Sequence, residues 1–338
     1  MMGKAGAIRQ TQGKGKSPMS FSVLTDTSGN LPLRLTGERD IAVIPFVYRM
    51  DGQEYTCTDI ERFDGAAFYQ QMKAGKTVAT SQISPAQYAD FFRPHLERGR
   101  DVIFISMSSG ISGSYNSARL AAEMLLMDFP NRHIHVVDTR GAALGEGLVA
   151  LRAADCRDEG LSFAEAVERL EQISQRMCNV FTVDDLMFLR RGGRLSNMAA
   201  IVGTVLNVKP LLKGDEEGRI VAFAKIRGRR RAIEALAERY EELAEEPEKQ
   251  VIGVVHAACD EDADRLIELL QKNRPPREIL KVGYEPVTGC HVGPGALALF
   301  FEGRDDVRAA LSDKKTALPD VKSALSSVKN ALGRSAEC

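Results

Sequence analysis

Apolar runs alternate with helical patterns through the first half of the chain. Four runs, each bounded by polar or turn residues, have the length and composition of buried strands: residues 21–24, 41–48, 102–107 and 134–137. Runs that are apolar throughout are typical of a mostly parallel sheet whose two faces are covered by helices. We therefore expect an N-terminal α/β domain over residues 21–160.

Two helix starts in this region carry a capping box, in which a serine is followed three residues later by Gln or Glu: Ser84 with Gln87, and Ser162 with Glu165. The first of these helices contains Pro94, which has no N–H to donate and should therefore end or kink the helix. The second should run to about Met177.

The pattern changes from Cys178 onward. A turn at residues 191–194 precedes an apolar helix over 198–206, and a turn at 214–218 joins a hairpin formed by 210–212 and 220–224. Helices and strands then alternate up to a closing strand, with helices over 229–245 and 260–272 and strands over 251–255 and 297–301. This pattern predicts a C-terminal α+β domain over residues 161–303.

The length of the chain agrees with two domains, since 338 residues exceed what one hydrophobic core usually organises. Residues 1–20 are rich in Gly, Lys, Gln and Ser and lack the apolar run of a secretory signal, so we expect a disordered lead. Residues 304–338 have weak helical periodicity, and we treat them as a C-terminal extension of unknown role.

Charge and cysteine content narrow the class of protein. The 45 basic and 46 acidic residues leave almost no net field, which argues against nucleic acid as the main partner. No apolar run approaches the about 18 residues of a membrane span, so we expect no integral membrane segment. The six cysteines include no C-x-x-C pair, and we read them as reduced thiols in a cytoplasmic protein.

The densest polar cluster lies between the strand at 102–107 and a helix that begins near Tyr115. It reads Ser106-Met107-Ser108-Ser109-Gly110-Ile111-Ser112-Gly113-Ser114. At the carboxyl end of a parallel strand, such a loop aims N–H groups and hydroxyls at a ligand, and the dipole of the next helix favours an anion. The alternative is a capped turn without a ligand.

A second hydroxyl cluster, Thr80-Ser81-Gln82, lies one helix earlier in the chain. Consecutive elements of such a sheet are commonly neighbours, so the two clusters could together bind a carboxylate or a phosphate through hydrogen bonds. The alternative for Thr80 and Ser81 is an ordinary helix cap.

Two further residues could serve the same anion. His291 stands in the glycine-rich segment 288–295, which we expect to be a turn, and its ring could donate a hydrogen bond to a carboxylate. Arg194 offers a planar pair of donors. The alternatives are a structural histidine and a surface arginine.

The sequence contains few motifs that would indicate an enzyme or a metal site. No G-x-S-x-G elbow surrounds the serines, and the Gly15-Lys16-Ser17 triplet lacks the first glycine and the strand of a phosphate loop. His133 and His135 share a strand face but have no third ligand at a suitable spacing. The basic run 227–231 opens a helix rich in glutamate, which indicates a solvated face. We expect no catalytic residue, cofactor or metal.

Seven segments, taken in order, resemble motifs of the DegV family of bacterial fatty-acid-binding proteins. Residues 25–32 are similar to D-S-T-x-D-L-P, 80–84 to T-S-Q-P-S, 108–115 to S-S-x-L-S-G-T-Y, 189–196 to L-x-K-G-G-R-I-S, 207–210 to N-I-K-P, 225–228 to K-V-R-G and 291–295 to H-x-G-P-G. The resemblance spans residues 22–301. The departures, which include Asn30 for Asp and Ser114 for Thr, remove neither the histidine nor Arg194.

The resemblance implies a long-chain fatty acid in a tunnel between the two domains. It also implies that the carboxylate contacts Thr80, one of the loop serines (Ser108, Ser109 or Ser112), His291 and, by analogy, Arg194. Among the serines we prefer Ser109 by its position. Since each buried methylene contributes ~0.8 kcal/mol, the acyl chain supplies ample binding energy, and the head group needs only hydrogen bonds.

In the best-understood members of this family, a separate ATP-dependent fatty acid kinase phosphorylates the bound acid to an acyl-phosphate for phospholipid synthesis. The resemblance thus implies a binding subunit that is not itself an enzyme, and Arg227 is the residue that we expect to touch the kinase. The alternatives are a serine-dependent acyl hydrolase and a protein that binds another small anion. The preferred length and saturation of the acyl chain are left open.

Overall fold

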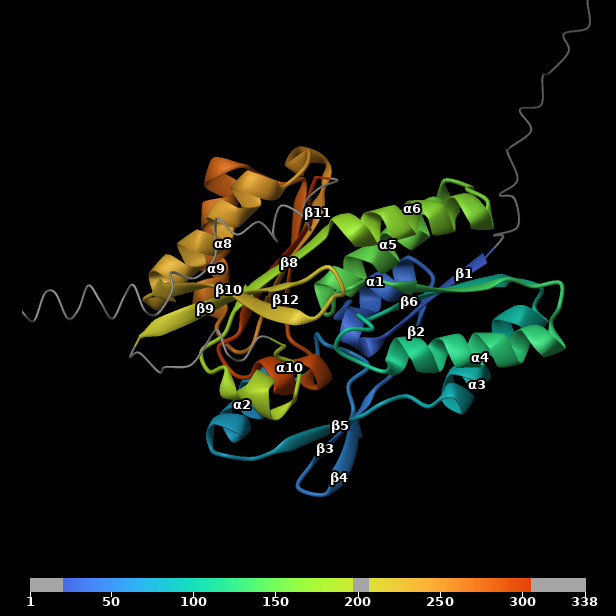
Figure 1. Cartoon of the computed structure of the whole chain (residues 1–338), viewed down its shortest axis with the longest axis horizontal. Helices are drawn as coiled ribbons and strands as arrows, with labels where there is room; N and C mark the ends of the chain where they lie inside the picture. Colours follow the sequence, from blue (N-terminus) through green and yellow to red (C-terminus); the bar gives the residue numbers. More distant parts are fainter. Residues whose placement is uncertain (1–20, 197–206, 305–338) are drawn as a thin grey trace, which may run out of the picture.

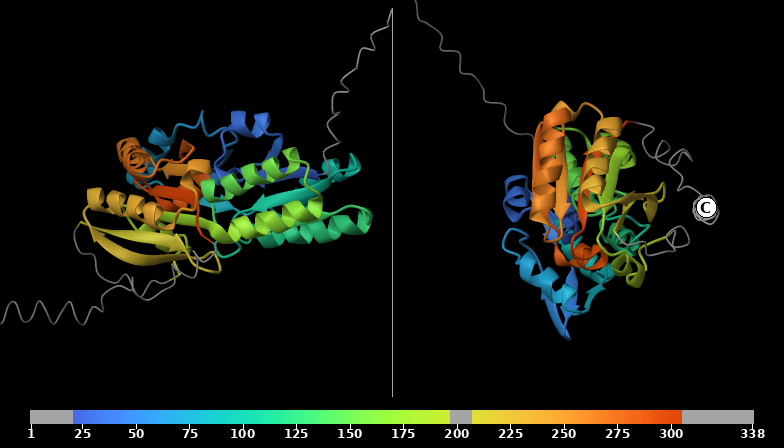
Figure 2. Two further views of the ribbon diagram at one scale, coloured as in Figure 1. Left: turned by 90° about the horizontal axis from the view of Figure 1, so that it is seen from above. Right: turned by 90° about the vertical axis from the view of Figure 1, so that its left-hand side faces the viewer.

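The strands form three sheets in the computed structural model of the chain, which describes residues 21–196 and 207–304 (Figure 1). One sheet has four strands, one has six, and a small one has three. Figure 2 shows the four-stranded and six-stranded sheets toward opposite ends of an elongated body. The expected combination of an N-terminal parallel sheet and a mixed C-terminal sheet is confirmed.

The four-stranded sheet has the strand order β2-β1-β6-β7, and every neighbouring pair is parallel. Its strands are β1 (Phe21–Asp26), β2 (Ile41–Ile44), β6 (Asp101–Ser106) and β7 (Ile134–Asp138). Their side chains are largely buried on both faces, which explains why the apolar runs were continuous.

The expected single strand over residues 41–48 is wrong, because the chain changes sheets in its middle. After β2 ends, β3 (Val47–Met50) pairs with β4 (Gln53–Thr56) and β5 (Val78–Ser81) in the small antiparallel sheet. Pro45 at the break has no N–H for a ladder, and the N–H of Phe46 donates instead to Thr27 Oγ1 at 3.0 Å.

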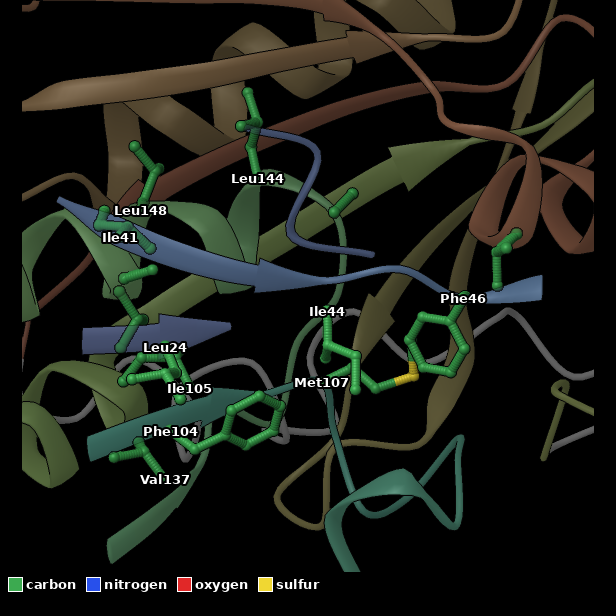
Figure 3. Packing of buried hydrophobic residues seen from close by; sticks show 14 of the residues in the cluster. Leu24, Ile41, Ile44, Phe46, Phe104, Ile105, Met107, Val137, Leu144 and Leu148 are labelled. Carbon is green, nitrogen blue, oxygen red and sulfur yellow. The ribbon is translucent and has the colours of Figure 1, made fainter. Parts of the chain in front are cut away.

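Helices cover both faces of the parallel sheet, with α3 (Pro85–Glu97) and α4 (Ser114–Asp128) on one side and α5 (Leu144–Asp158) and α6 (Phe163–Arg176) on the other (Figure 1). Figure 3 shows Leu148 of α5 beside the strand residue Ile41. Helix α5 also contacts β8, β11 and β13, so it packs between the two large sheets.

Both predicted capping boxes are present at the starts of α3 and α6, where the serine side chain and the Gln or Glu side chain bond each other's backbone N–H. Of the two effects expected of Pro94, an end of the helix is wrong, since α3 continues to Glu97, and a kink stays a prediction. The flanking Phe92 and Leu96 are buried, and their packing offsets the backbone hydrogen bond that Pro94 cannot make.

The six-stranded sheet has the order β10-β9-β8-β13-β11-β12, and its neighbours are antiparallel except for β11 and β12. Its strands are β8 (Met177–Thr182), β9 (Val208–Gly214), β10 (Ile220–Arg227), β11 (Val251–His256), β12 (Glu278–Gly283) and β13 (Leu297–Glu302). The predicted hairpin and closing strand are therefore confirmed. Helices α8 (Arg229–Leu243) and α9 (Asp260–Asn273) pack on this sheet, as expected.

Several short elements were not predicted. They are η1 (Thr27–Gly29), α1 (Leu33–Glu38), α2 (Gly65–Lys73), α7 (Met187–Arg191), η3 (Pro247–Lys249) and α10 (Pro286–Val292), together with β4, β5, β8 and β12. The segment expected to be a glycine-rich turn at 288–295 contains the second half of α10, because Glu285 caps that helix through the N–H groups of Val287 and Thr288.

Buried side chains form a continuous cluster across the parallel sheet and the inner face of the mixed sheet. The division of the chain at residue 160 stays a prediction, and α6, which follows it, packs on β7 and α5. None of the helices in the described ranges is both long and apolar enough to cross a membrane. The expected helix over 198–206 and the expectations for residues 1–20 and 305–338 lie outside the described residues.

Candidate functional site

A cavity of about 240 Å³ lies where the parallel sheet, the small sheet and the six-stranded sheet meet. Its walls come from β5, the loops that follow β6 and β7, the inner faces of β8 and β13, the β9–β10 turn, and helices α7 and α10. This space is much larger than a single water needs. A carboxylate or phosphate alone would fill only a small part of it.

The predicted residues Thr80, Ser112, Arg194 and His291 all line this cavity. Thr80 Oγ1 and His291 Nε2 are 3.2 Å apart, although the two residues are 211 positions apart in the chain. The Nε of Arg194 donates to the carbonyl of Ile111 at 3.3 Å, which ties the arginine to the backbone next to Ser112. We call these four residues the polar group of the cavity.

Local structure brings the histidine and the threonine together. Thr80 lies on β5 opposite Tyr48 of β3, and α10, which carries His291, packs against β3, β5, α2 and α7. A Cβ atom on Gly192, just after α7, would collide with the His291 ring. Glycine at this position therefore allows the end of α7, and with it Arg194, to approach the histidine.

The positive charge of the polar group comes from Arg194. Burial lowers the pKa of His291 to about 4, and the nearby Arg194 guanidinium lowers it as well, so the ring is neutral at pH 7. Within residues 21–196 and 207–304, no carboxylate forms an ion pair with Arg194. A cation, two hydroxyls and a neutral imidazole at one cavity wall can together hold an anion through hydrogen bonds.

Ser108 and Ser109 do not line the cavity. The Ser108 hydroxyl is fully buried and donates to the carbonyl of Gly218 at 2.8 Å. The exposed Ser109 donates to Asp138 Oδ2 at 2.6 Å. The backbone turns between residues 108 and 112, where two N–H groups donate to the Ser108 carbonyl, so successive serines of this loop face different surroundings.

Arg227 is exposed at the end of β10 and also does not line the cavity. The arginines that follow it pair with acidic side chains: Arg229 with Asp184 and Asp262, Arg230 with Glu234, and Arg231 with Glu234 and Glu238. The exposed Arg230 and Arg231 agree with the expectation of a solvated, charged helix face, whereas the Arg229 side chain is mostly buried and does not.

The remaining walls are mostly apolar, and the sequence did not identify them. They include Phe46, Met107, Phe181, Leu189, Val287 and Phe300. Figure 3 shows the sulfur of Met107 against the ring of Phe46. Phe181 belongs to β8, which was not predicted. Successive side chains of a strand point to opposite faces of the sheet, so a prediction of β8 would have placed Phe181 on one of its two faces.

A second polar cluster lies at the carboxyl end of β1, and its four residues do not line the cavity. We call Thr25, Asp26, Ser28 and Glu146 the carboxyl cluster. Ser28 Oγ is hydrogen-bonded to both Asp26 Oδ1 and Glu146 Oε2, and Thr25 Oγ1 bonds Glu146 Oε1 at 2.9 Å. Burial raises the pKa of Asp26 to about 6 and that of Glu146 well above its usual value. Burial therefore favours the protonated form of both carboxyl groups.

In the part of the chain that the structure describes, no group of three or more His, Cys, Asp and Glu side chains is placed to hold a metal ion. The carboxyl cluster is occupied by its own hydroxyls, and the histidines at 133 and 135 bond to Asp101 and Glu171 respectively. The polar group therefore lines the cavity, whereas the carboxyl cluster and these two histidines do not.

Comparison with known proteins gives consistent matches. A family model described as "Uncharacterised protein, DegV family" matches residues 20–304. A DegV domain-containing protein of Clostridium perfringens is 34% identical over 283 residues, which cover 84% of this chain and 97% of that protein.

Solved structures with the same fold include a DegV family protein from Thermus thermophilus, described by its fatty acid binding. It has a TM-score of 0.77 and 31% identity, over 85% of this chain and 100% of that one. DegV of Bacillus subtilis, described as a fatty acid binding protein, has a TM-score of 0.72 and 32% identity over 85% and 100% of the two chains.

Proposed function

This chain belongs to the DegV family, and we propose that it binds a long-chain fatty acid in the cavity. The carboxylate would lie at Thr80, Ser112, Arg194 and His291, and the acyl chain would run along the apolar walls. The observation that carries this proposal is the shape of the site: one polar group, which includes Arg194, opens into a cavity whose other walls are mostly apolar.

The energetics support a lipid rather than a small anion. Ten buried methylenes would contribute about 8 kcal/mol, since each contributes ~0.8 kcal/mol. The head group adds charge-assisted hydrogen bonds from Arg194 and the hydroxyls, which fix the direction in which the ligand lies. A neutral His291 avoids the cost of a second buried cation and can still donate one hydrogen bond.

We assign the main serine contact to Ser112 instead of Ser109. The hydroxyl of Ser109 already donates to Asp138 outside the cavity. Ser112 lines the cavity, and its hydroxyl is bonded to the hydroxyl of Ser114 at 2.9 Å and accepts from the Ser114 N–H at 3.2 Å. Ser108 is sealed beneath Gly218, so it supports the loop and does not reach the ligand.

We further propose that the bound carboxylate is presented to a separate ATP-dependent fatty acid kinase, with Arg227 in the docking surface, and that the protein acts in the cytoplasm. The exposure of Arg227 supports its place in a docking surface. The free thiols of Cys57, Cys156, Cys259 and Cys290 support a location in the cytoplasm.

A serine-dependent acyl hydrolase has weaker support. No serine at the cavity is hydrogen-bonded to a histidine in the described part of the chain, and His291 has Thr80 as its partner. No carboxylate in that part orients the His291 ring, so the third member of a hydrolytic triad is not provided there.

The test is native mass spectrometry of the purified chain, combined with lipid extraction. We expect an adduct of fatty-acid mass that exchanges with added palmitate and is diminished in Thr80→Val but not in Ser109→Ala. Absence of any adduct, together with no binding of added palmitate, would refute the proposal. Turnover of an acyl ester that is lost in Ser112→Ala would favour the hydrolase.

A further inference from the structure

Helix α4 carries an apolar stripe on its outer face. Among the described residues, six large apolar side chains are exposed, and three of them, Leu120, Met124 and Met127, lie on α4. Their spacing of four and then three residues places them in one line on the helix, and Met127 is 79% exposed. The opposite face of α4 is buried through residues such as Ala121 and Leu125. A line of exposed apolar side chains is typical of an interaction surface, and we call these three residues the α4 stripe.

The helical periodicity of the C-terminal extension is concentrated in one segment, residues 319–332, which lies outside the described residues. Pro319 and Asp320 are typical of the first turn of a helix, and Gly333 is typical of the position just after its end. Apolar residues recur between them at spacings of four, three and four: Val321, Leu325, Val328 and Leu332. The sequence therefore predicts an amphipathic helix whose apolar side has the same spacing as the α4 stripe.

The 319–332 segment is too short to be stable without a partner. An isolated helix of about 12–15 residues is marginal in water, and a coiled coil usually needs about three or four heptads. Residues 319–332 cover only two heptads, so pairing between two such segments is not favoured. A folded helix with an exposed stripe of matching spacing provides the apolar surface that the segment needs.

The chain leaves the described fold within reach of α4. The N–H of Gly303 donates to the carbonyl of Arg176 at 2.9 Å, so the chain leaves at the end of α6. Helices α6 and α4 pack on the two faces of β7, which is an edge strand of the parallel sheet (Figure 1). Residues 305–318 can span up to about 45 Å, whereas a helix with its side chains is about 10–12 Å wide. The extension can therefore pass the edge of the sheet and reach the outer face of α4.

Charged residues beside the two apolar stripes are complementary. Glu123 and Asp128 lie on either side of the α4 stripe, and each forms an exposed ion pair with an arginine. Lys322 and Lys329 each follow a stripe residue of the 319–332 segment by one position, so both lie along one side of that stripe. Exposed ion pairs contribute little, so the carboxylates can exchange their arginine partners for these lysines at little cost.

We propose that residues 319–332 form a helix that packs on the α4 stripe of the same chain. The apolar side chains of the two helices cover each other, and the lysines of the segment face the carboxylates of α4. The family model ends at residue 304, so this contact is a property of the extension and not of the family fold. It does not depend on the ligand of the cavity.

The experiment measures the oxidation of single methionines by hydrogen peroxide in the full chain, read by mass spectrometry of peptides. Met124 and Met127 should be oxidised several-fold more slowly in the wild type than in Leu325→Asp, which places a charge in the apolar stripe of the segment. Ser327→Asp is the matched control, because it adds the same charge outside that stripe, and it should leave both rates unchanged. Met187 on α7 is 43% exposed and should be oxidised at the same rate in all three proteins.

A reciprocal variant tests the same contact from α4. Trypsin should cleave after Lys322 and Lys329 faster in Met124→Asp and in Leu325→Asp than in the wild type, and thermal unfolding confirms that each variant is folded. Equal oxidation of Met127 in the wild type and Leu325→Asp, or wild-type cleavage in Met124→Asp, would overturn the proposal. Protection of Met127 that appears only as the protein concentration rises would assign the α4 stripe to a second copy of the chain and overturn it as well.

Discussion

The polar group of the cavity and the carboxyl cluster are built from similar residues and differ in what satisfies them. In the carboxyl cluster, Thr25 and Ser28 donate to Asp26, to Glu146 or to the carbonyl of Ile105, all within the protein. In the polar group, Arg194 has no carboxylate partner within the described ranges. Hydroxyl-rich strand ends thus become a binding site only where the protein leaves donors for a ligand.

This difference predicts that the two regions respond to mutation through different observables. Changes in the carboxyl cluster should reduce stability, whereas changes in the polar group should reduce ligand affinity in a protein that stays folded.

The largest effect is expected at Glu146. Glu146→Ala should lower the free energy of unfolding by about 3 kcal/mol, because it leaves a void in a fully buried site and removes acceptors of Thr25 and Ser28. Urea unfolding monitored by circular dichroism measures the loss. Glu146→Gln should cost much less, since burial raises the pKa of Glu146 and the amide mimics its protonated carboxyl group. Equal losses in the two variants would contradict the account.

The next effect concerns pH and the third buried carboxyl, Glu285. Burial raises the pKa of Glu285 from 4.5 to about 7, so the folded state holds a proton that the unfolded chain releases. Stability should therefore fall as pH rises from about 4.5 to 7, by on the order of 3 kcal/mol from this group. Unfolding at pH 5 and pH 8 should show a smaller pH dependence in Glu285→Gln.

Ligand affinity should behave differently in the same experiment. Because the pKa of His291 is lowered to about 4, its charge does not change between pH 6 and pH 8, and palmitate affinity should be nearly constant there. A large change of affinity across this range that disappears in His291→Gln would show that the ring titrates in it.

The third effect is expected at Thr80. Thr80→Val keeps the shape of the side chain and removes the hydroxyl 3.2 Å from His291, so palmitate affinity should fall about tenfold or more. The free energy of unfolding should change by less than about 1 kcal/mol. Titration with palmitate measures the affinity, and urea unfolding measures the stability. A loss of stability without a loss of affinity would show that the Thr80 hydroxyl has a structural role, like those of the carboxyl cluster.

The smallest effect separates the serines of the loop after β6. Ser112→Ala should weaken palmitate binding about threefold, since its hydroxyl also serves Ser114. Ser109→Ala should leave affinity unchanged within experimental error, because its hydroxyl donates to Asp138 outside the cavity. A larger loss of palmitate affinity in Ser109→Ala than in Ser112→Ala would show that Ser109 makes the main contact.

Much of the fold could be predicted because its signals are local. The capping boxes at Ser84 and Ser162 involve residues three positions apart, and the strands of the parallel sheet are continuous apolar runs. The small sheet was missed because β4 is exposed at all four positions and carries no apolar alternation. The break at Pro45 was likewise hidden within an apolar run.

The site could be predicted only in part, because its geometry depends on contacts between distant segments. Thr80 and His291 were associated through the resemblance to a family and not through any local pattern. Which serine faces the cavity is decided by the β9–β10 turn, since Gly218 accepts from Ser108 across 110 positions and Gly110 packs against Glu217. No local pattern in the loop contains that information.

The most direct test of the account is the ¹³C NMR signal of carboxyl-labelled palmitate bound to the wild-type protein. We predict that the carboxyl group stays ionised to a lower pH than free palmitate, because Arg194 and the hydroxyls favour the charged form. We also predict that its signal shifts in Thr80→Val and Arg194→Met but not in Ser109→Ala. A bound carboxyl that titrates like the free acid, with the same signal in all three variants, would contradict the placement of the head group.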